Sequence, residues 1–391
     1  MDALLSVFTA FTPFEWILCV ILLLSFLVQL FFYLSVYRKP YAYVKKRKES
    51  SIPAKDLPGI SVIITSKNNS EELKKNLPFV LEQDYPNFEV IVVNSGSTDE
   101  TDMVLKAAQI KYPHLYHTFV PADVDTINEK KLALTLGIKA AKNDVLLFTE
   151  AYCRPCSSQW ITSYGKEFVR GRDIVLGFSK LIIPKRVPLR KFILFDNLIH
   201  HVKFLSMAIV HRPFMGIGRN MAYKKELFFA NKGFSPILNI EGGEDDLYIN
   251  RIARGKETGV VLSPDSMTET TSVDNFFTWR ALKSKYLYTK QFYKGFSSHL
   301  FRYDTFSKYA FYAVLIATIV RGIFTSNYYL TGFALLLFMI RFWVQINVIN
   351  KNSRLFDAGK YHINFILFDL FQPFNNLRFR RYANRRNNTG R

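Results

Sequence analysis

Between residues 59 and 150, short apolar runs alternate with longer stretches in which apolar positions recur at helical spacing. The runs predict strands at residues 59–65, 88–94, 115–120 and 144–149, and the stretches predict helices at residues 70–82, 99–111 and 128–141. Because the runs are continuously apolar rather than alternating, we expect both faces of the sheet to be covered. The βαβα order predicts an α/β fold with a parallel sheet and right-handed crossovers.

Polar loops follow three of the predicted strands, at residues 66–70, 95–98 and 150–157. Ligands bind open α/β sheets at the carboxyl ends of the strands. These loops are therefore the first place to look for a binding site. Ser97 and Glu100 have the spacing of a capping box, which predicts the start of the second helix.

Long apolar stretches lie near both ends of the chain. Residues 14–37 carry one charge, Glu15, and are long enough to span a bilayer. No Lys or Arg precedes this stretch and the basic residues 38–48 follow it, so we expect an uncleaved span that leads into the cytoplasm. Residues 309–324 and 328–349 predict a hairpin of two spans; Arg321 and Arg341 weaken that prediction, although an Arg near a helix end can snorkel.

The region after the hairpin is too short or too polar to span again. Residues 363–374 carry Asp369 and Pro373 and are expected to lie in the membrane interface. The predicted organisation is a short N-terminal segment (1–13), a transmembrane helix (14–37), a basic juxtamembrane linker (38–58), a cytoplasmic domain (59–300), a transmembrane hairpin (309–349), and an interfacial helix with a basic cytoplasmic tail (350–391). This is the pattern of a multi-pass protein of the cell membrane.

The formal net charge of +20 is concentrated beside the predicted spans. Residues 38–57 hold seven Lys or Arg and two acids, and residues 351–391 hold nine and two, which together supply +12. The excess therefore favours contact with anionic lipid, and no nucleic-acid partner is expected. Cys153 and Cys156 form a lone CxxC with no second pair and no nearby His, which argues against a zinc site.

The most informative polar segment is residues 212–254. Gly216 and Gly218 lead into Asn220, and four acids follow within six positions: Glu241, Glu244, Asp245 and Asp246. Acids this close repel one another, so a fold needs a reason to gather them. A catalytic base or a cation site would be a functional reason. The alternative is the charged first turn of a helix at residues 246–254, where acids suit the helix dipole.

Several stretches of this chain resemble family 2 glycosyltransferases of the GT-A fold. They are SVIITSKNNSEEL, EQDYPNFEVIVVNSGSTDET and EKKLALTLGIKAAKNDVLLFTEAYCRPCSSQWI. FMGIGRNMAYKKELFFANKGF and GGEDDLYINRIA resemble the membrane-bound branch of that family, which also has one leading span and C-terminal spans. The resemblance covers residues 59–300. It implies a Rossmann-like nucleotide-diphospho-sugar transferase domain, a nucleotide-sugar donor and an inverting transfer to an acceptor.

The resemblance also implies a set of donor-binding residues at the strand ends. The loop after the first strand would hold the base and ribose, Asn94 and Ser95 stand where the family has paired aspartates, and Lys130 belongs to a basic pair beside the diphosphate. The implied donor-binding residues are Thr65, Lys67, Asn68, Asn94, Ser95, Lys130 and Glu150.

The family's metal-binding Asp-x-Asp is replaced by Glu150-Ala151-Tyr152. Two carboxylates suit a hard divalent cation such as Mg or Mn. Glu150 remains a candidate metal ligand, whereas Tyr152 is a poor one at neutral pH. The sequence therefore leaves a divalent cofactor in question.

The acceptor side is better preserved. The resemblance implies that Gly216, Gly218 and Asn220 border the acceptor, and Asp246 is included with them although it also suits the helix terminus. Alignment on Asp246-Leu247 makes Glu244 the first candidate for the base that takes the acceptor's proton, with Asp245 a close competitor.

Two functions follow from these patterns. The first is an inverting glycosyltransferase that uses a membrane-associated acceptor, such as a lipid-linked glycan or a polysaccharide precursor. Residues 279–286 lack the Gln-x-x-Arg-Trp of processive synthases, which favours non-processive transfer. The alternative is a catalytically degenerate scaffold that binds a partner, favoured by the missing acids at Asn94, Ser95 and Tyr152.

Overall fold

Seven strands form the main sheet, in the spatial order β3-β2-β1-β4-β8-β6-β9. The first four run parallel to one another, whereas β8 is antiparallel to both of its neighbours. The strands are β1 Ile60–Ser66, β2 Phe88–Ser95, β3 Leu115–Val120, β4 Val145–Glu150, β6 Ile174–Gly177, β8 Met221–Lys224 and β9 Thr258–Val261. This computed structural model describes residues 11–47, 52–120, 128–271 and 273–389. The four predicted strands and their parallel pairing are confirmed, each strand to within one residue at either end.

Helices cover both faces of the sheet because successive strand residues point to opposite sides. Val62 and Ile64 pack toward α4, α5 and α7, whereas Ile63 and Ile91 pack toward α6 and α8. The helices of this domain are α4 Ser70–Leu81, α5 Thr101–Lys111, α6 Glu129–Ala140, α7 Trp160–Val169, α8 Arg190–Ile209, α9 Lys225–Ala230, α10 Asp246–Ile252 and α11 Phe276–Thr289. The three predicted helices are confirmed to within two residues. A small second sheet joins β5 Cys153–Pro155, β10 Thr268–Thr270 and β7 Ser179–Leu181 in that order.

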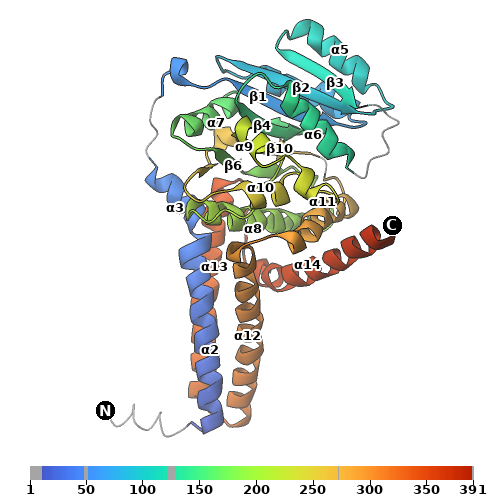
Figure 1. Ribbon diagram of the computed structural model, residues 1–391. Coiled ribbons are helices and arrows are strands. Elements are labelled where there is room, and N and C mark those ends of the chain that lie inside the picture. Colours follow the sequence, from blue (N-terminus) through green and yellow to red (C-terminus); the bar gives the residue numbers. More distant parts are fainter. Residues whose placement is uncertain (1–10, 48–51, 121–127, 272, 390–391) are drawn as a thin grey trace.

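Three long helices stand side by side below this domain (Figure 1). They are α2 Pro13–Phe31, which continues through the π-helical turn η1 Phe32–Tyr37 into α3 Lys39–Lys46, then α12 Phe296–Phe324 and α13 Tyr328–Leu355. Each of α2, α12 and α13 contacts the other two. They contain the three predicted spans. The structure does not describe residues 1–10 of the predicted N-terminal segment, 48–51 of the linker, or 390–391 of the tail.

Within the described ranges, four helices are long and apolar enough to cross a membrane, and the fourth is α8. This helix lies across the end of the three-helix bundle rather than along it (Figure 1). It contacts β6, β7 and β9, and most of its side chains are buried in the protein. The helix α14 Asn364–Thr389 also lies across the bundle and contacts α8 and α11. A single helix thus covers both the predicted interfacial segment and most of the basic tail.

Arg341 does not snorkel to a helix end. Its side chain is 1% exposed and forms an ion pair with Asp369 of α14 at 3.2 Å. It also donates a hydrogen bond to Gln29 of α2 at 3.0 Å. Arg321 is paired as well, with Glu15 at 3.1 Å. The partners of Arg341 offset the cost of removing its guanidinium group from water.

Candidate functional site

The carboxyl ends of β1, β2 and β4 meet at one edge of the sheet. Thr65 lies opposite Glu150, and Ser66 lies opposite Asn94. Thr65, Asn94 and Glu150 are each less than a tenth exposed. Parallel pairing therefore brings three of the predicted donor-binding residues to one place.

Asn68 and Asn94 hold the two loops beside this edge. The Asn68 side chain accepts a hydrogen bond from the backbone N–H of Thr98 at 2.8 Å, and the Asn94 side chain accepts one from that of Ser97 at 3.2 Å. Asn68 has a φ of 52°, in the left-handed region that Asn tolerates better than most residues. Ser95 is buried at the end of β2. These predicted donor-binding residues shape the loops that a ligand would meet.

The capping box predicted for Ser97 and Glu100 is wrong. Helix α5 begins at Thr101, and Glu100 makes no side-chain capping bond. Asp99 instead accepts hydrogen bonds from the backbone N–H groups of Thr101 at 3.1 Å and Ser70 at 2.9 Å. It therefore ties the start of α5 to the start of α4.

Lys130 of α6 lies between the strand edge and the acid cluster. Its ammonium is 2.5 Å from Glu150 Oε1 and 3.0 Å from Glu244 Oε1. The more exposed Lys67, from the loop after β1, pairs with Glu129 at 2.6 Å. One partly exposed lysine, Lys130, therefore joins Glu150, a predicted donor-binding residue, to Glu244, the first candidate for the base. The sequence did not indicate this pair of contacts.

The charge of Lys130 keeps Glu244 ionised. The Glu244 side chain is only 12% exposed, and burial alone would raise the pKa of its carboxyl. The adjacent ammonium outweighs burial and lowers that pKa to about 2. Because a carboxylate with so low a pKa binds a proton weakly, Glu244 is a poor proton acceptor while Lys130 stays bound to it.

Residues 150–152 do not fit a divalent cation held by carboxylates. Glu150 faces the ammonium of Lys130 instead of a second acid. Burial raises the pKa of the Tyr152 phenol, and a neutral phenol is a poor ligand for a hard cation. Across the ranges that the structure describes, no group of three or more His, Cys, Asp or Glu side chains could hold a metal. The positive charge at this position comes from the lysine.

Asp245 is fixed at the start of α10 by three hydrogen bonds. Its carboxylate accepts from the backbone N–H of Gly218 at 2.9 Å, from the hydroxyl of Tyr286 at 2.9 Å and from the backbone N–H of Asp246 at 2.8 Å. A Cβ on residue 218 would lie 3.2 Å from that of Asp245, which is why a glycine suits this close approach. We call the space in front of it the strand-end cavity, which is lined by Thr65, Lys130, Glu150, Gly218, Glu244 and Asp245, among others.

Asn220 and Gly216, both predicted to border an acceptor, are packed inside the domain. Asn220 is 1% exposed. Its side-chain oxygen accepts hydrogen bonds from Trp160 and Tyr164, and its amide donates to two backbone carbonyls. A Cβ on Gly216 would meet buried side chains at about 3.0 Å. Neither residue is open to an acceptor, so both support the site from behind.

Asp246 is also closed to an acceptor. Its carboxyl is fully buried and accepts hydrogen bonds from the hydroxyls of Thr289 and Tyr293, at and just beyond the end of α11. Burial, together with the nearby charge of Asp245, raises its pKa well above the ordinary value of 3.8. Asp246 therefore holds α10 to the end of α11.

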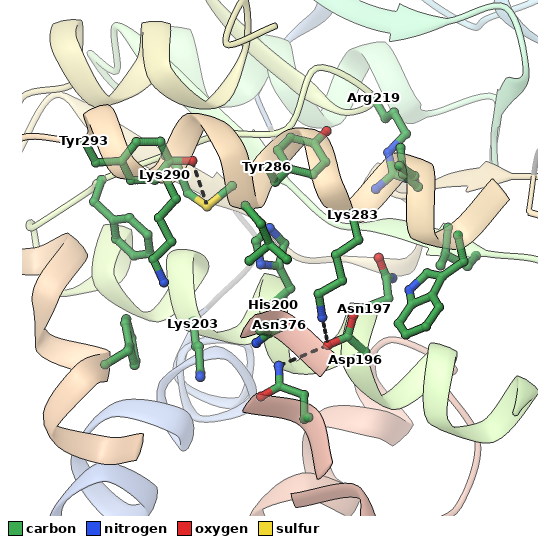
Figure 2. Close-up of a pocket in the computed structure, with 18 residues that line it drawn as sticks. Asp196, Asn197, His200, Lys203, Arg219, Lys283, Tyr286, Lys290, Tyr293 and Asn376 are labelled. Atoms are coloured by element: carbon green, nitrogen blue, oxygen red, sulfur yellow. Dashed lines mark hydrogen bonds and ion pairs between the residues drawn. The ribbon is translucent and has the colours of Figure 1, made fainter. Parts of the chain in front are cut away.

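A second cavity, which we call the helix-lined cavity, lies where α8, α11 and α14 meet (Figure 2). Tyr286 lines it, and the hydroxyl of Tyr286 is the one bound to Asp245. Asp245 therefore connects the two cavities, whereas Glu244, which also lines the strand-end cavity, is paired with Lys130. The sequence did not single out this cavity, although Lys283, Tyr286 and Lys290 recur at the spacing of one helix face.

Comparison with known proteins identifies relatives of the α/β domain. Residues 61–229 match the family model described as Glycosyl transferase family 2. A ceramide glucosyltransferase of Komagataella phaffii is 25% identical over 234 residues, which are 54% of this chain and 42% of that protein. A poly-beta-1,6-N-acetyl-D-glucosamine synthase of Staphylococcus epidermidis is 34% identical over 94 residues, which are 24% of this chain and 21% of that protein. The matched part is less than half the length of either relative.

The fold has a counterpart among solved structures. A mannosyltransferase from Pyrobaculum calidifontis, solved in complex with GDP-Man and Mn2+, matches with a TM-score of 0.54 and 18% identity. The match covers 88% of this chain and 99% of that chain. At this identity it establishes the fold, which is GT-A as the sequence resemblance implied.

Proposed function

We propose that this chain, which carries a family 2 glycosyl transferase domain, is an inverting glycosyltransferase that moves a sugar from a nucleotide-sugar donor to a membrane-associated acceptor. The observation that supports this most is the position of Asp245. It lines the strand-end cavity together with three of the proposed donor residues (Thr65, Lys130 and Glu150), and it is bound to Tyr286 of the helix-lined cavity. A carboxylate between two such cavities can take a proton from an acceptor in one as it attacks a sugar held in the other.

The donor would bind at the strand-end cavity with its diphosphate against Lys130. A diphosphate is a stronger partner for an ammonium than a single carboxylate is, so it would compete with Glu150 and Glu244 for this lysine. Once Lys130 turns toward the diphosphate, Glu244 loses the charge that lowers its pKa. Donor binding would therefore redistribute charge across the site.

The transfer would follow a single displacement. The acceptor oxygen forms a bond to the anomeric carbon, and the bond from that carbon to the diphosphate oxygen breaks. The electron pair leaves with the nucleoside diphosphate, where Lys130 offsets its charge, and the acceptor proton passes to Asp245. Attack on the face opposite the leaving group would invert the anomeric centre.

The geometry favours Asp245 over Glu244 as this base. Asp245 is held by three donors and adjoins the helix-lined cavity through Tyr286. Glu244 shares the strand-end cavity with Asp245, but it is paired with Lys130 and also lines a separate cavity with Lys285 and Tyr288. The order proposed from the sequence is therefore reversed.

The membrane-associated acceptor and the cytoplasmic location are further parts of the proposal. The helix-lined cavity lies next to the bundle of α2, α12 and α13, which suits an acceptor anchored in a bilayer. The basic residues 38–48 and 378–391 support a cytoplasmic location for the domain, by the positive-inside rule. Residues 279–286 lack the motif of processive synthases, which supports one transfer per binding event.

Titration of the full-length protein in detergent with a panel of nucleoside diphosphate sugars tests the donor site. We expect at least one donor to bind and to label a membrane lipid fraction with its sugar. If no donor binds, the proposed function is wrong.

The alternative is a scaffold that keeps the fold without catalysis. It is favoured by Asn94 and Ser95, which replace paired acids, and by Lys130, which already has two carboxylate partners. A double variant, Glu244→Gln with Asp245→Asn, distinguishes the two functions in a deletion strain. Full complementation by the folded variant would support the scaffold, and loss of complementation would support catalysis.

A further inference from the structure

We propose that the helix-lined cavity binds the phosphate of the acceptor, which is therefore a lipid with a phosphate-bearing headgroup. The identification of this lipid as the acceptor rests on the proposed function. The inference that the cavity binds a lipid phosphate rests on the residues that line the cavity, and it holds even if the protein transfers no sugar.

The charges that line the cavity are unbalanced. Four cationic side chains line it, and Asp196 is the one carboxylate among its lining residues. Asp196 is already occupied, because Lys283 pairs with it and Gln372 donates a hydrogen bond to it at 3.0 Å. The cations are Lys203, Arg219, Lys283 and Lys290. An anionic ligand would supply the missing charge.

Arg219 gives the strongest indication. It is 3% exposed, and no carboxylate of the described residues lies within ion-pair distance of it. Among the described residues its Nε has no hydrogen-bond partner, and its guanidinium donates a long hydrogen bond of 3.4 Å to the hydroxyl of Thr270. Buried charges in proteins are normally paired. The guanidinium therefore has donors left for an oxyanion, which its planar fork binds well.

Lys290 and Lys203 line the same cavity, Lys290 from the turn after α11 and Lys203 from α8 (Figure 2). Lys290 has no acidic partner in the part of the chain that the structure describes. Lys203 lies 3.9 Å from Asp304, whose carboxylate already accepts a hydrogen bond from Tyr37 at 2.6 Å, and its ammonium also lies over the rings of Tyr37 and Phe301. Among the described residues, neither ammonium has a close carboxylate partner, so both can meet an anionic ligand.

Apolar side chains make up much of the rest of the wall, beside the polar Asn197, Gln372 and Asn376, which indicates a lipid rather than free phosphate. Phe214, Trp279, Leu282, Leu287 and Phe301 line the cavity. Phe301 belongs to α12, which runs on into the three-helix bundle. An acyl or isoprenoid chain could thus follow the bundle while its phosphate reaches the cations. This arrangement would direct the headgroup toward Tyr286 and Asp245.

Lipid binding to the full-length protein in detergent micelles tests the proposal. The probes are a polyprenyl phosphate, dioleoylphosphatidic acid, dioleoylglycerol and inorganic phosphate. We expect both phosphate-bearing lipids to bind at least about tenfold more tightly than dioleoylglycerol, because each charge-assisted hydrogen bond is a strong one. Equal affinity for dioleoylglycerol would overturn the proposal, and so would displacement of the lipids by inorganic phosphate at equal concentration.

Lys290→Gln is the informative variant because Lys290 is exposed and has no acidic partner to leave behind. It should weaken the phosphate-bearing lipids by about tenfold and leave dioleoylglycerol unchanged. Lys294→Gln is the matched control, since Lys294 is exposed nearby but does not line the cavity. Equal effects of the two variants would refute a specific site.

Donor titration of the same preparations separates the two proposals. Lipid preference without any nucleotide-sugar binding would refute the transfer reaction and keep the phosphate site. Donor binding with no preference for phosphate-bearing lipid would refute the phosphate site and keep the transfer reaction.

Discussion

The ion pair between Lys130 and Glu244 allows a quantitative test of how the site is held together. The pKa of Glu244 falls from its ordinary value of 4.5 to about 2 in the folded protein. At about 1.36 kcal/mol per pKa unit, this corresponds to about 3 kcal/mol in favour of the folded state at neutral pH, most of it from Lys130. Because the pKa is lowered, the contribution is present above pH 4.5 and is lost as the pH falls toward about 2.

A double-mutant cycle measures this coupling. The variants are Lys130→Met, Glu244→Gln and both together, and the readout is the free energy of urea unfolding of the domain in detergent at neutral pH. The single variants should destabilise by amounts whose sum exceeds the effect of the double variant, with a coupling free energy of about 2–3 kcal/mol. Lys139→Met, an exposed lysine on the same helix, should change the unfolding free energy by less than about 0.5 kcal/mol.

The result that would refute this reasoning is additivity. If the coupling free energy is below about 0.5 kcal/mol, Lys130 does not determine the charge state of Glu244. The proposed competition between a donor diphosphate and the two carboxylates would then lose its basis.

Three further predictions concern Asp245, the need for a metal, and Asp246. Asp245→Asn should lower kcat by about 10²- to 10⁴-fold with donor affinity retained, measured by sugar transfer and by titration; a kcat within about tenfold of wild type would exclude Asp245 as the base. Adding EDTA should change the donor Kd by less than about threefold, because Lys130 rather than a carboxylate pair meets the diphosphate, and a loss of about tenfold or more would show a required metal. The raised pKa of Asp246 means that the folded state keeps a proton that the unfolded state releases, so stability should fall as the pH rises above 3.8 toward the folded pKa. Asp246→Asn should lessen this fall in unfolding midpoints between about pH 5 and about pH 9, and an unchanged pH dependence would contradict the assignment.

The pattern of apolar and polar residues along the sequence was enough to predict the parallel strands of the main sheet. Continuous apolar runs identified β1, β2, β3 and β4, and their order implied the parallel register that places Thr65 beside Glu150. The predicted capping box of Ser97 and Glu100 is wrong, because Asp99 accepts the hydrogen bond from the backbone N–H of Thr101 at the start of α5. Asp99 also accepts one from Ser70 of α4, a contact between helices that a local pattern does not indicate. Arg341 was misjudged for a similar reason, since its partners lie on α2 and α14.

The sequence by itself determined the α/β fold, the three long apolar helices and the edge of the sheet where a ligand would bind. Those features depend on periodicity, chain length and charge, all of which are local. Only the tertiary structure decided which partner each acid of the cluster has. Glu244 and Asp245 are adjacent in the chain, yet one pairs with Lys130 of α6 and the other with Tyr286 of α11. The burial of Arg219 without a carboxylate partner, among the residues that the structure describes, is likewise known only from the folded chain.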